Sequence, residues 1–207
     1  MKGVSLTGLP HHVIQRGLDG RKTFFNSEDY STYLEIISEC TRHHNIEILC
    51  YCLMPDHVHL IAVPNQKDAL SLCLHAVDSR YTKYIHLKTG TTDQVWQDRY
   101  ASHLLDEEHF ITCARYIEIN PVKRKYVEQP EEWQWSSARA HIFKTPDTLI
   151  DTDRLLCSVK IHWQDFLAEK RADDEADMFY LHEKNGKPLG NDAFLAMIES
   201  RLHKENE

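Results

Sequence analysis

The sequence predicts an α+β fold of the ferredoxin-like type, in which an antiparallel sheet carries helices on one face. Two observations support this prediction. Apolar residues alternate over several short segments, as in half-buried strands, and recur at helical spacing over longer ones. The resulting order is strand, helix, strand, strand, helix, strand and a further helix, and its first six elements match the ferredoxin-like order.

Local signals set the expected boundaries. Ser27 and Asp106 are typical helix N-caps. Pro121 should end the last helix at Asn120, because the residue before a proline avoids the α region. In chain order, we expect a strand at His11–Gly17, a helix over about 28–44, a strand at Ile46–Leu53, a turn at Met54–Asp56, a strand at His57–Val63, a helix at Asp68–Lys88, a strand at Val95–Leu105 and a helix after Asp106.

The charge is distributed unevenly along the chain. The total is −8, with 16 basic and 18 acidic residues in 1–145 (−2) and 8 and 14 in 146–207 (−6). We therefore expect a main domain over 1–145 and a small, mostly helical, acidic accessory region over 146–207. The latter should include a turn at Gly186–Gly190 and a short helix capped by Asn191. The overall charge argues against wrapping of nucleic acid but allows a local basic groove.

The composition also bears on the compartment. No apolar run approaches the roughly 20 residues of a membrane span, and the segment MKGVSLTGLPHH lacks the apolar core of a signal peptide. We expect a cytoplasmic protein without a membrane partner, whose six cysteines are mostly buried thiols.

Two short patterns point to chemistry. His57 and His59 lie two apart on an expected strand, so both imidazoles face one side and form half of a metal site. Tyr116 and Asn120 lie four apart on a helix and share a face. Tyrosine is a known nucleophile in covalent catalysis, and an amide oxygen can bind a metal. Taken singly, each pattern is more often structural, as surface histidines, a half-buried tyrosine or a helix-terminal asparagine.

Four motifs together carry a family resemblance. In chain order, they are HVIQRG at His12–Gly17, YCLMPDHVHL at Tyr51–Leu60, RYIEINPV at Arg115–Val122 and WQWSS at Trp133–Ser137. They resemble the signatures of the REP-associated tyrosine transposases, within the single-tyrosine HUH transposase superfamily. The match extends over roughly residues 8–142, with all four motifs in family order.

The resemblance implies metal-dependent cleavage and strand transfer of single-stranded DNA through a 5′-phosphotyrosine. Carried over to this chain, Tyr116 would be the nucleophile, His57 and His59 would be metal ligands, and Asn120 a third ligand. The cofactor would be Mg²⁺ or Mn²⁺. The substrate would be single-stranded or hairpin DNA, typically a repeated extragenic palindrome. The enzyme would be a DNA-associated bacterial protein, either a monomer or a homodimer.

Several basic residues are candidate phosphate contacts, although each could equally be solvated surface. They are Arg16, Arg21, Lys22, Arg80, Lys83, Lys123, Arg124 and Lys125. The last three depart from the family pattern, in which a single basic residue commonly follows Asn-Pro-Val. Trp133 and Trp135 could stack on bases, but tryptophans so placed more often pack a tail onto the domain. A metal-bound hydroxide, His11 or His12 could accept the proton of the tyrosine, whose free pKa is about 10.

Three other functions stay open at this point. Cys50, Cys52, His57 and His59 could form a structural zinc site in a binding module. The chain could instead be a catalytically inactive binder of hairpin DNA, although it retains both histidines and the tyrosine. A homodimeric scaffold that uses the sheet has no specific support in the sequence.

Overall fold

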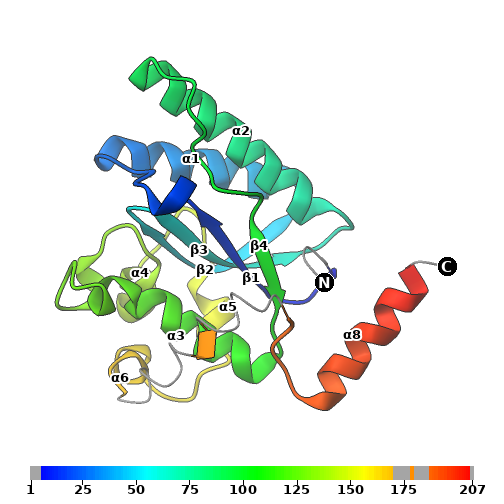
Figure 1. The fold of residues 1–207 in the computed structure, drawn as a ribbon. Coiled ribbons are helices and arrows are strands. Elements are labelled where there is room, and N and C mark those ends of the chain that lie inside the picture. Colours follow the sequence, from blue (N-terminus) through cyan, green and yellow to red (C-terminus); the bar gives the residue numbers. More distant parts are fainter. Residues whose placement is uncertain (1–5, 170–177, 180–186, 206–207) are drawn as a thin grey trace.

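A four-stranded antiparallel sheet forms the centre of the protein in the computed structural model, which describes residues 6–169, 178–179 and 187–205 (Figure 1). The spatial order is β2-β3-β1-β4, as in the ferredoxin-like fold, so the predicted fold class is confirmed. The strands are β1 (His11–Arg16), β2 (Ile46–Met54), β3 (His57–Pro64) and β4 (Ala101–Leu104).

The two helices of the ferredoxin-like order, α1 (Ser27–His43) and α2 (Ala69–Thr89), pack on one face of this sheet, as predicted. The further helix after the fourth strand, α3 (Glu107–Lys123), lies on the other face, so that helices cover both (Figure 1). Alternation along the strands divides the side chains between two cores. The first core contains Val13, Tyr51, Leu53, Val58 and Leu60 with α1 and α2, and the second contains Cys50, Cys52, Met54 and Ile61 with α3.

A bulge in β2 adjusts which residues face which helix layer. The register between β2 and β3 shifts between Ile48 and Cys50. Because of this extra residue, Ile48 and Tyr51 both reach the first core, while Cys50 lies in the second. The bulge therefore reverses the alternation, so that even-numbered residues face the first core before it and odd-numbered residues face that core after it.

Helix caps agree with the sequence in two places and differ in one. The side chains of Asp106 and Asn191 accept hydrogen bonds from the backbone N–H groups of His109 and Phe194, so both expected caps are confirmed. The expected cap at Ser27 is wrong by one residue. Asn26 caps α1 through a reciprocal pair of hydrogen bonds with Asp29, and this pair satisfies two backbone N–H groups at the helix start.

The expected end of α3 before Pro121 is wrong, because the helix continues to Lys123. Pro121 removes only its own backbone N–H. The carbonyl groups of Asn120 and Pro121 still accept hydrogen bonds from the N–H groups of Arg124 and Tyr126, both at 2.9 Å. Asn120 and Pro121 are buried, so packing outweighs the local preference of the residue before a proline.

The fourth strand is shorter than the expected Val95–Leu105. Its ladder with β1 covers only β4, Ala101–Leu104. Upstream, the chain touches β1 and the 3₁₀ helix η1 (Leu18–Gly20) through single contacts, including a bridge from Gly17 to Trp96. Bends before β4 interrupt the ladder, so the apolar pattern at Val95 reflects packing against the first core rather than strand pairing.

The segments after α3 pack in two places. The 3₁₀ helix η2 (Pro130–Glu132) and helices α4 (Ala138–Phe143), α5 (Thr152–Leu156) and α6 (Trp163–Leu167) lie near α3 and β2. Leu189 forms a parallel bridge with Leu105, and α8 (Asp192–Glu205) packs against Leu6 and Leu104. The expected turn at Gly186–Gly190 falls partly outside the described residues. No helix in the described part of the chain is long and apolar enough to cross a membrane.

Candidate active site

Two histidines of β3 point to the α3 face of the sheet. His57 and His59 lie on either side of Val58, whose side chain enters the opposite core. Their ring centroids are 4.9 Å apart with the ring planes at 89°, and both residues are buried. The strand spacing therefore places both imidazoles on one side, as predicted.

Each of these imidazoles has one nitrogen in a hydrogen bond. Nδ1 of His57 lies 2.6 Å from Oδ1 of Asp56, and Nδ1 of His59 lies 2.9 Å from Nε2 of His12. The contact with His57 also holds the pKa of the Asp56 carboxyl below its usual value. Hydrogen bonds of this kind select the tautomer and orient the Nε2 atom of a metal-binding histidine.

The electrostatic environment keeps His59 neutral. Burial lowers its pKa well below 6.5, and electrostatic interactions with His57, His12, Arg16 and Arg124 lower it further. A neutral imidazole keeps the lone pair that a metal ion requires. At neutral pH, His59 is therefore in the protonation state of a ligand.

Tyr116 lies beside His59 of this histidine pair. Helix α3 buries Phe110, Cys113, Ala114 and Ile117 in the second core, which leaves Tyr116 half-buried on its flank. The tyrosine ring centroid is 5.5 Å from that of His59 and 6.2 Å from that of His12, in edge-on arrangements. Helix α3 thus brings the expected nucleophile to the expected metal ligands.

Two further aromatic groups complete the surroundings of Tyr116. Phe179, from the C-terminal region, stacks on its ring at 5.1 Å between centroids and 23° between planes. His103 of β4 lies 6.3 Å from His12, and burial lowers its pKa to about 4. His11, in contrast, faces the other side of β1 and contacts Ser102 and the backbone of Leu6. Of the two histidines considered as proton acceptors, only His12 is on the tyrosine side.

Asn120 lies one helical turn beyond Tyr116 and is buried. In the described part of the structure, its Oδ1 atom has no hydrogen-bond partner. A buried polar atom without a partner is costly and calls for an explanation, such as a ligand. An amide oxygen is a suitable donor to a hard divalent cation. The chemistry of two imidazoles and one amide oxygen suits such an ion and would leave coordination positions open.

The geometry gives no support to a structural zinc site. The Sγ atom of Cys50 contacts the carbonyl of Ala114 and the carboxylate of Glu118, and that of Cys52 contacts the sulfur of Met54. Burial raises the pKa of both thiols well above the ordinary value, which disfavours thiolate ligands. Among the described residues, no three histidine, cysteine, aspartate or glutamate side chains cluster to hold a metal ion.

The candidate phosphate contacts fall on two sides of the molecule. Arg16 and Arg124 lie near enough to His59 to lower its pKa, so they add positive charge to the site. Arg21 and Lys22 are exposed on the loop whose backbone at Thr23 bonds to Pro55, beside the turn before His57. Lys123 and Lys125 flank Arg124 where α3 ends.

The other two candidates lie in the helix layer across the sheet. Arg80 forms an ion pair with Glu39 at 2.5 Å, and Lys83 is exposed on α2. Because α2 and α3 cover opposite faces, these two side chains are separated from the tyrosine by the sheet (Figure 1). The sequence alone could not make this distinction, since all eight residues look alike as isolated basic side chains.

Sequence reasoning did not assign a role to Asp56 or Glu118. Asp56 immediately precedes His57, and a carboxylate beside a candidate ligand is a signal that could have identified it. Glu118 sits inside the tyrosine motif, but two of its partners, His141 and Trp163, come from segments without a strong pattern. Its burial is revealed only by the folded structure.

Comparison with known proteins supports the family resemblance of the motifs. The family model described as IS200-like transposase matches residues 7–120, more than half of the chain. A Haemophilus influenzae protein described as a REP-associated tyrosine transposase is 24% identical over 131 residues, covering 58% of this chain and 74% of that protein. The Escherichia coli REP-associated tyrosine transposase is 27% identical over 125 residues, covering 58% and 71%.

A solved structure shares the fold. It is that of a REP-associated tyrosine transposase bound to a REP hairpin, with a TM-score of 0.61 and 21% identity over 73% of this chain and 92% of that one. The matched family region contains both histidines, the tyrosine and Asn120. The relationship that the four motifs predicted is confirmed, and the chain belongs to the IS200-like transposase family.

Proposed function

We propose that this transposase-family protein cleaves and rejoins single-stranded DNA through a covalent 5′-phosphotyrosine on Tyr116. The observation that carries the proposal is the placement of this tyrosine over His59, 5.5 Å between ring centroids, with His57 on the same strand face. A nucleophile beside two imidazoles that can bind a cation suits attack on a phosphodiester.

His57, His59 and Asn120 would hold a divalent cation, Mg²⁺ or Mn²⁺. The support is the shared face of the imidazoles, their Nδ1 hydrogen bonds and the unpartnered Oδ1 of Asn120 within the described structure. When bound, the cation supplies charge neutralisation at the non-bridging phosphate oxygens. Asp56 and His12 would keep the two imidazoles in the tautomer and orientation that present Nε2.

In the first step, the phenolic oxygen of Tyr116 attacks phosphorus in line with the leaving 3′ oxygen. The new bond joins tyrosine to the 5′ phosphate, the phosphorus–oxygen bond to the 3′ side breaks, and the 3′ oxygen takes up a proton. The phenol releases its proton to water in the same step, and the 3′ oxygen takes its proton from water. His12 lies on the tyrosine side of the sheet and contacts the ring edge-on, whereas His11 does not, but Nε2 of His12 is already hydrogen-bonded to Nδ1 of His59.

The second step reverses the first with a different DNA end. A 3′-hydroxyl attacks the phosphotyrosine, forms a new phosphodiester and releases Tyr116. Because the covalent link retains the phosphodiester's energy, strand transfer needs no external energy source. The substrate class we propose is hairpin-forming palindromic DNA, as the names of the relatives and of the hairpin-bound structure suggest. Arg16, Arg21, Lys22 and Lys123–Lys125 would contact its phosphates.

The test is incubation with labelled single-stranded hairpin DNA and MnCl₂ or MgCl₂, followed by a denaturing gel. We expect cleavage and a protein-linked band that chelation with EDTA abolishes. Binding of the hairpin without cleavage in either metal would instead support the catalytically inactive binder. Tightly bound zinc that is needed for folding would support the zinc-stabilised module.

A further inference from the structure

The tryptophan–serine motif, Trp133–Ser137, lies along the free edge of β2. The backbone N–H of Leu53 donates to the carbonyl of Trp135 at 2.9 Å, and that of Ser137 donates to the carbonyl of Tyr51 at 3.0 Å. An antiparallel bridge joins Cys52 to Ser136. The motif thus pairs with a sheet edge that would otherwise expose its backbone groups.

The tryptophans of this motif are used in packing. Trp135 stacks on Tyr30 of α1, with 4.7 Å between ring centroids and 9° between planes. The indole N–H of Trp133 donates to the carbonyl of Leu53 at 3.0 Å. These contacts agree with the alternative that the two tryptophans pack the tail onto the domain. Ser137 of the same motif contacts Glu118 of α3.

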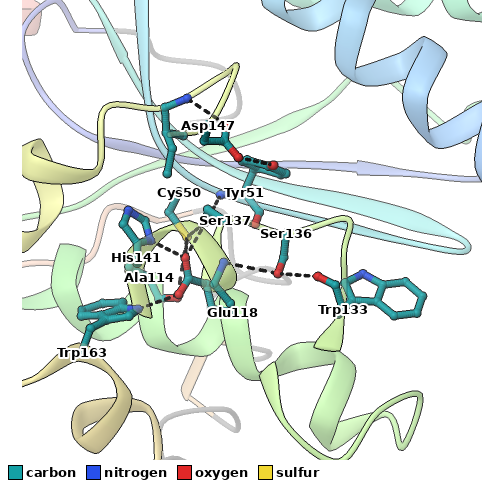
Figure 2. A network of polar contacts seen from close by, with 12 residues as sticks. Cys50, Tyr51, Ala114, Glu118, Trp133, Ser136, Ser137, His141, Asp147 and Trp163 are labelled. Atoms are coloured by element: carbon teal, nitrogen blue, oxygen red, sulfur yellow. Dashed lines mark hydrogen bonds and ion pairs between the residues drawn. The ribbon is translucent and has the colours of Figure 1, made fainter. Parts of the chain in front are cut away.

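Ser137 belongs to a buried network around Glu118 (Figure 2). The Glu118 carboxylate is fully buried and accepts hydrogen bonds from three oxygen or nitrogen donors, besides the weak Sγ contact of Cys50 at 3.7 Å. One oxygen accepts from the hydroxyl of Ser137 and lies 2.6 Å from Nδ1 of His141 on α4, and the other accepts from Nε1 of Trp163 on α6 at 2.6 Å. Figure 2 shows Ser137 and His141, from the start and the body of α4, and Trp163 of α6 converging on Glu118.

Glu118 lies on the side of α3 opposite the candidate site residues. Successive helix residues are about 100° apart, so Glu118 projects roughly opposite to both Tyr116 and Asn120. The turn that carries the nucleophile on one side is therefore fixed by a buried carboxylate on the other. Burying a carboxylate is costly unless its oxygens are hydrogen-bonded, so loss of one donor should disturb this turn of α3.

A second set of contacts holds Arg115, the residue before Tyr116, against the α6 segment that carries Trp163. Arg115 is buried and donates to the backbone carbonyl of Phe166 at 3.1 Å and to Glu169 at 2.8 Å. Its guanidinium also lies 4.0 Å from the centroid of the Phe166 ring. The residues on both sides of Tyr116 in the motif thus contact the α6 segment.

We propose that Glu118 is a positioning residue for the nucleophile, and that Ser137, His141 and Trp163 act through it to hold Tyr116 and Asn120 in place. This inference rests on the proposed role of Tyr116. It assigns Ser137 of the tryptophan–serine motif to the alignment of α3, and it extends the set of positioning residues beyond residue 145 to Trp163 of α6. The effect belongs to the chemical step, because none of these four side chains is offered as a DNA contact.

The experiment uses two pairs of matched variants of the full chain. Trp163→Phe removes the N–H donor to Glu118 and keeps an aromatic ring, while Trp96→Phe makes the same change where the indole nitrogen has no hydrogen-bond partner among the described residues. Ser137→Ala removes a second donor to the same carboxylate. Ser136→Ala changes the neighbouring serine, whose hydroxyl bonds, among the described residues, only to the backbone of Trp133 and Ala138.

Three quantities are measured for each variant with labelled hairpin DNA: the single-turnover cleavage rate at saturating DNA, the Kd and the melting temperature. Trp163→Phe and Ser137→Ala should slow cleavage by about tenfold or more, since small misplacement of a reacting group is costly. Their Kd should stay within about twofold of the wild-type value, a difference of roughly 0.4 kcal/mol. Both controls should cleave at the wild-type rate.

The outcomes separate this inference from the proposed function. Wild-type rates in both folded test variants would overturn the positioning role while leaving the tyrosine mechanism intact. Rates that fall in test and control variants alike, in step with the melting temperature, would show a merely structural role and also overturn it. Absence of a covalent adduct in the wild-type protein would overturn the proposed function itself. Should Ser137→Ala fail to fold, the Trp163→Phe pair decides.

Discussion

The two imidazoles of β3 have different partners, and this difference bears on what each contributes. His57 is bonded to the carboxylate of Asp56, and His59 to the imidazole of His12. A carboxylate partner makes an imidazole a stronger donor to a metal ion. The His12 contact instead requires one of the two rings to carry the shared proton. For His59 to bind a metal through Nε2, its Nδ1 must donate to His12.

At this scale, we predict that His57→Ala or His59→Ala abolishes most cleavage but leaves DNA binding. Either change removes a ligand for the cation, and cleavage should fall by about 100-fold or more, since the charge stabilisation at stake is several kcal/mol. Basic residues elsewhere supply the nonspecific attraction to DNA, so Kd should change little. Cleavage gels and fluorescence anisotropy with one hairpin measure the two quantities.

The control for this pair is His75→Ala, which removes an exposed histidine of α2 on the other side of the sheet. It should affect neither quantity. Parallel loss of binding and cleavage in the β3 variants would indicate that these histidines support the fold, as in a structural zinc site.

At the scale of elements, α3 carries Tyr116 and Asn120 on one side and the buried Glu118 on the other. This arrangement was only partly predictable from the sequence. Strand alternation predicted that His57 and His59 share a face, and helical spacing paired Tyr116 with Asn120. The contact between His12 and His59 depends on strand register across 47 residues, which no local pattern encodes. Packing also determines where α3 ends, because the burial of Pro121 outweighs the tendency of the residue before a proline to leave the helix.

The C-terminal region was harder still. The sequence predicted its acidic charge and the helix capped by Asn191. It did not predict α5 and α6, because each is only five residues long and shows no clear periodicity. Their apolar residues pack singly onto α3, as Leu155, Trp163 and Leu167 do. Such contacts are specified by the surface that receives them rather than by a repeating pattern.

Phe179 leads to a prediction about the acidic accessory region. Its ring is fully buried and stacks on Tyr116, so it covers one face of the proposed nucleophile. Phe179→Ala should therefore raise the rate of cleavage at limiting DNA by about 3- to 10-fold, equivalent to roughly 1 kcal/mol. Single-turnover kinetics at several DNA concentrations would measure this change.

Phe143→Ala serves as the control, since that ring is 51% exposed. Slower cleavage by the Phe179 variant would mean that the stacked ring supports the site rather than restricting it. The point substitution is more informative than truncation after residue 145, because truncation also removes Trp163 from Glu118.

At the scale of the whole molecule, positive charge is concentrated near the candidate site although the net charge of the protein is negative. The sum is −8, but Arg16 and Arg124 concentrate positive charge beside His59, while Arg80 is paired with Glu39 across the sheet. Local charge, rather than the total, governs where a phosphate backbone is attracted.

Arg124→Gln should therefore weaken binding of hairpin DNA and lower the slope of log Kd against log salt by about one, as expected for one lost phosphate contact. Arg80→Gln should leave the slope unchanged. Binding isotherms at four or more salt concentrations would measure both. Equal slopes for the two variants would contradict the placement of the DNA on the α3 side.

The most direct test of the account is to map the covalent adduct. Wild-type protein incubated with hairpin DNA and MnCl₂ should yield, after digestion, a peptide in which Tyr116 carries a 5′-linked nucleotide. Tyr116→Phe removes one oxygen and keeps the ring, so it should fold, bind the hairpin and form no adduct, whereas Tyr126→Phe, at an exposed tyrosine, should form it normally. An adduct on another tyrosine, or one that persists in Tyr116→Phe, would contradict the assignment of the nucleophile.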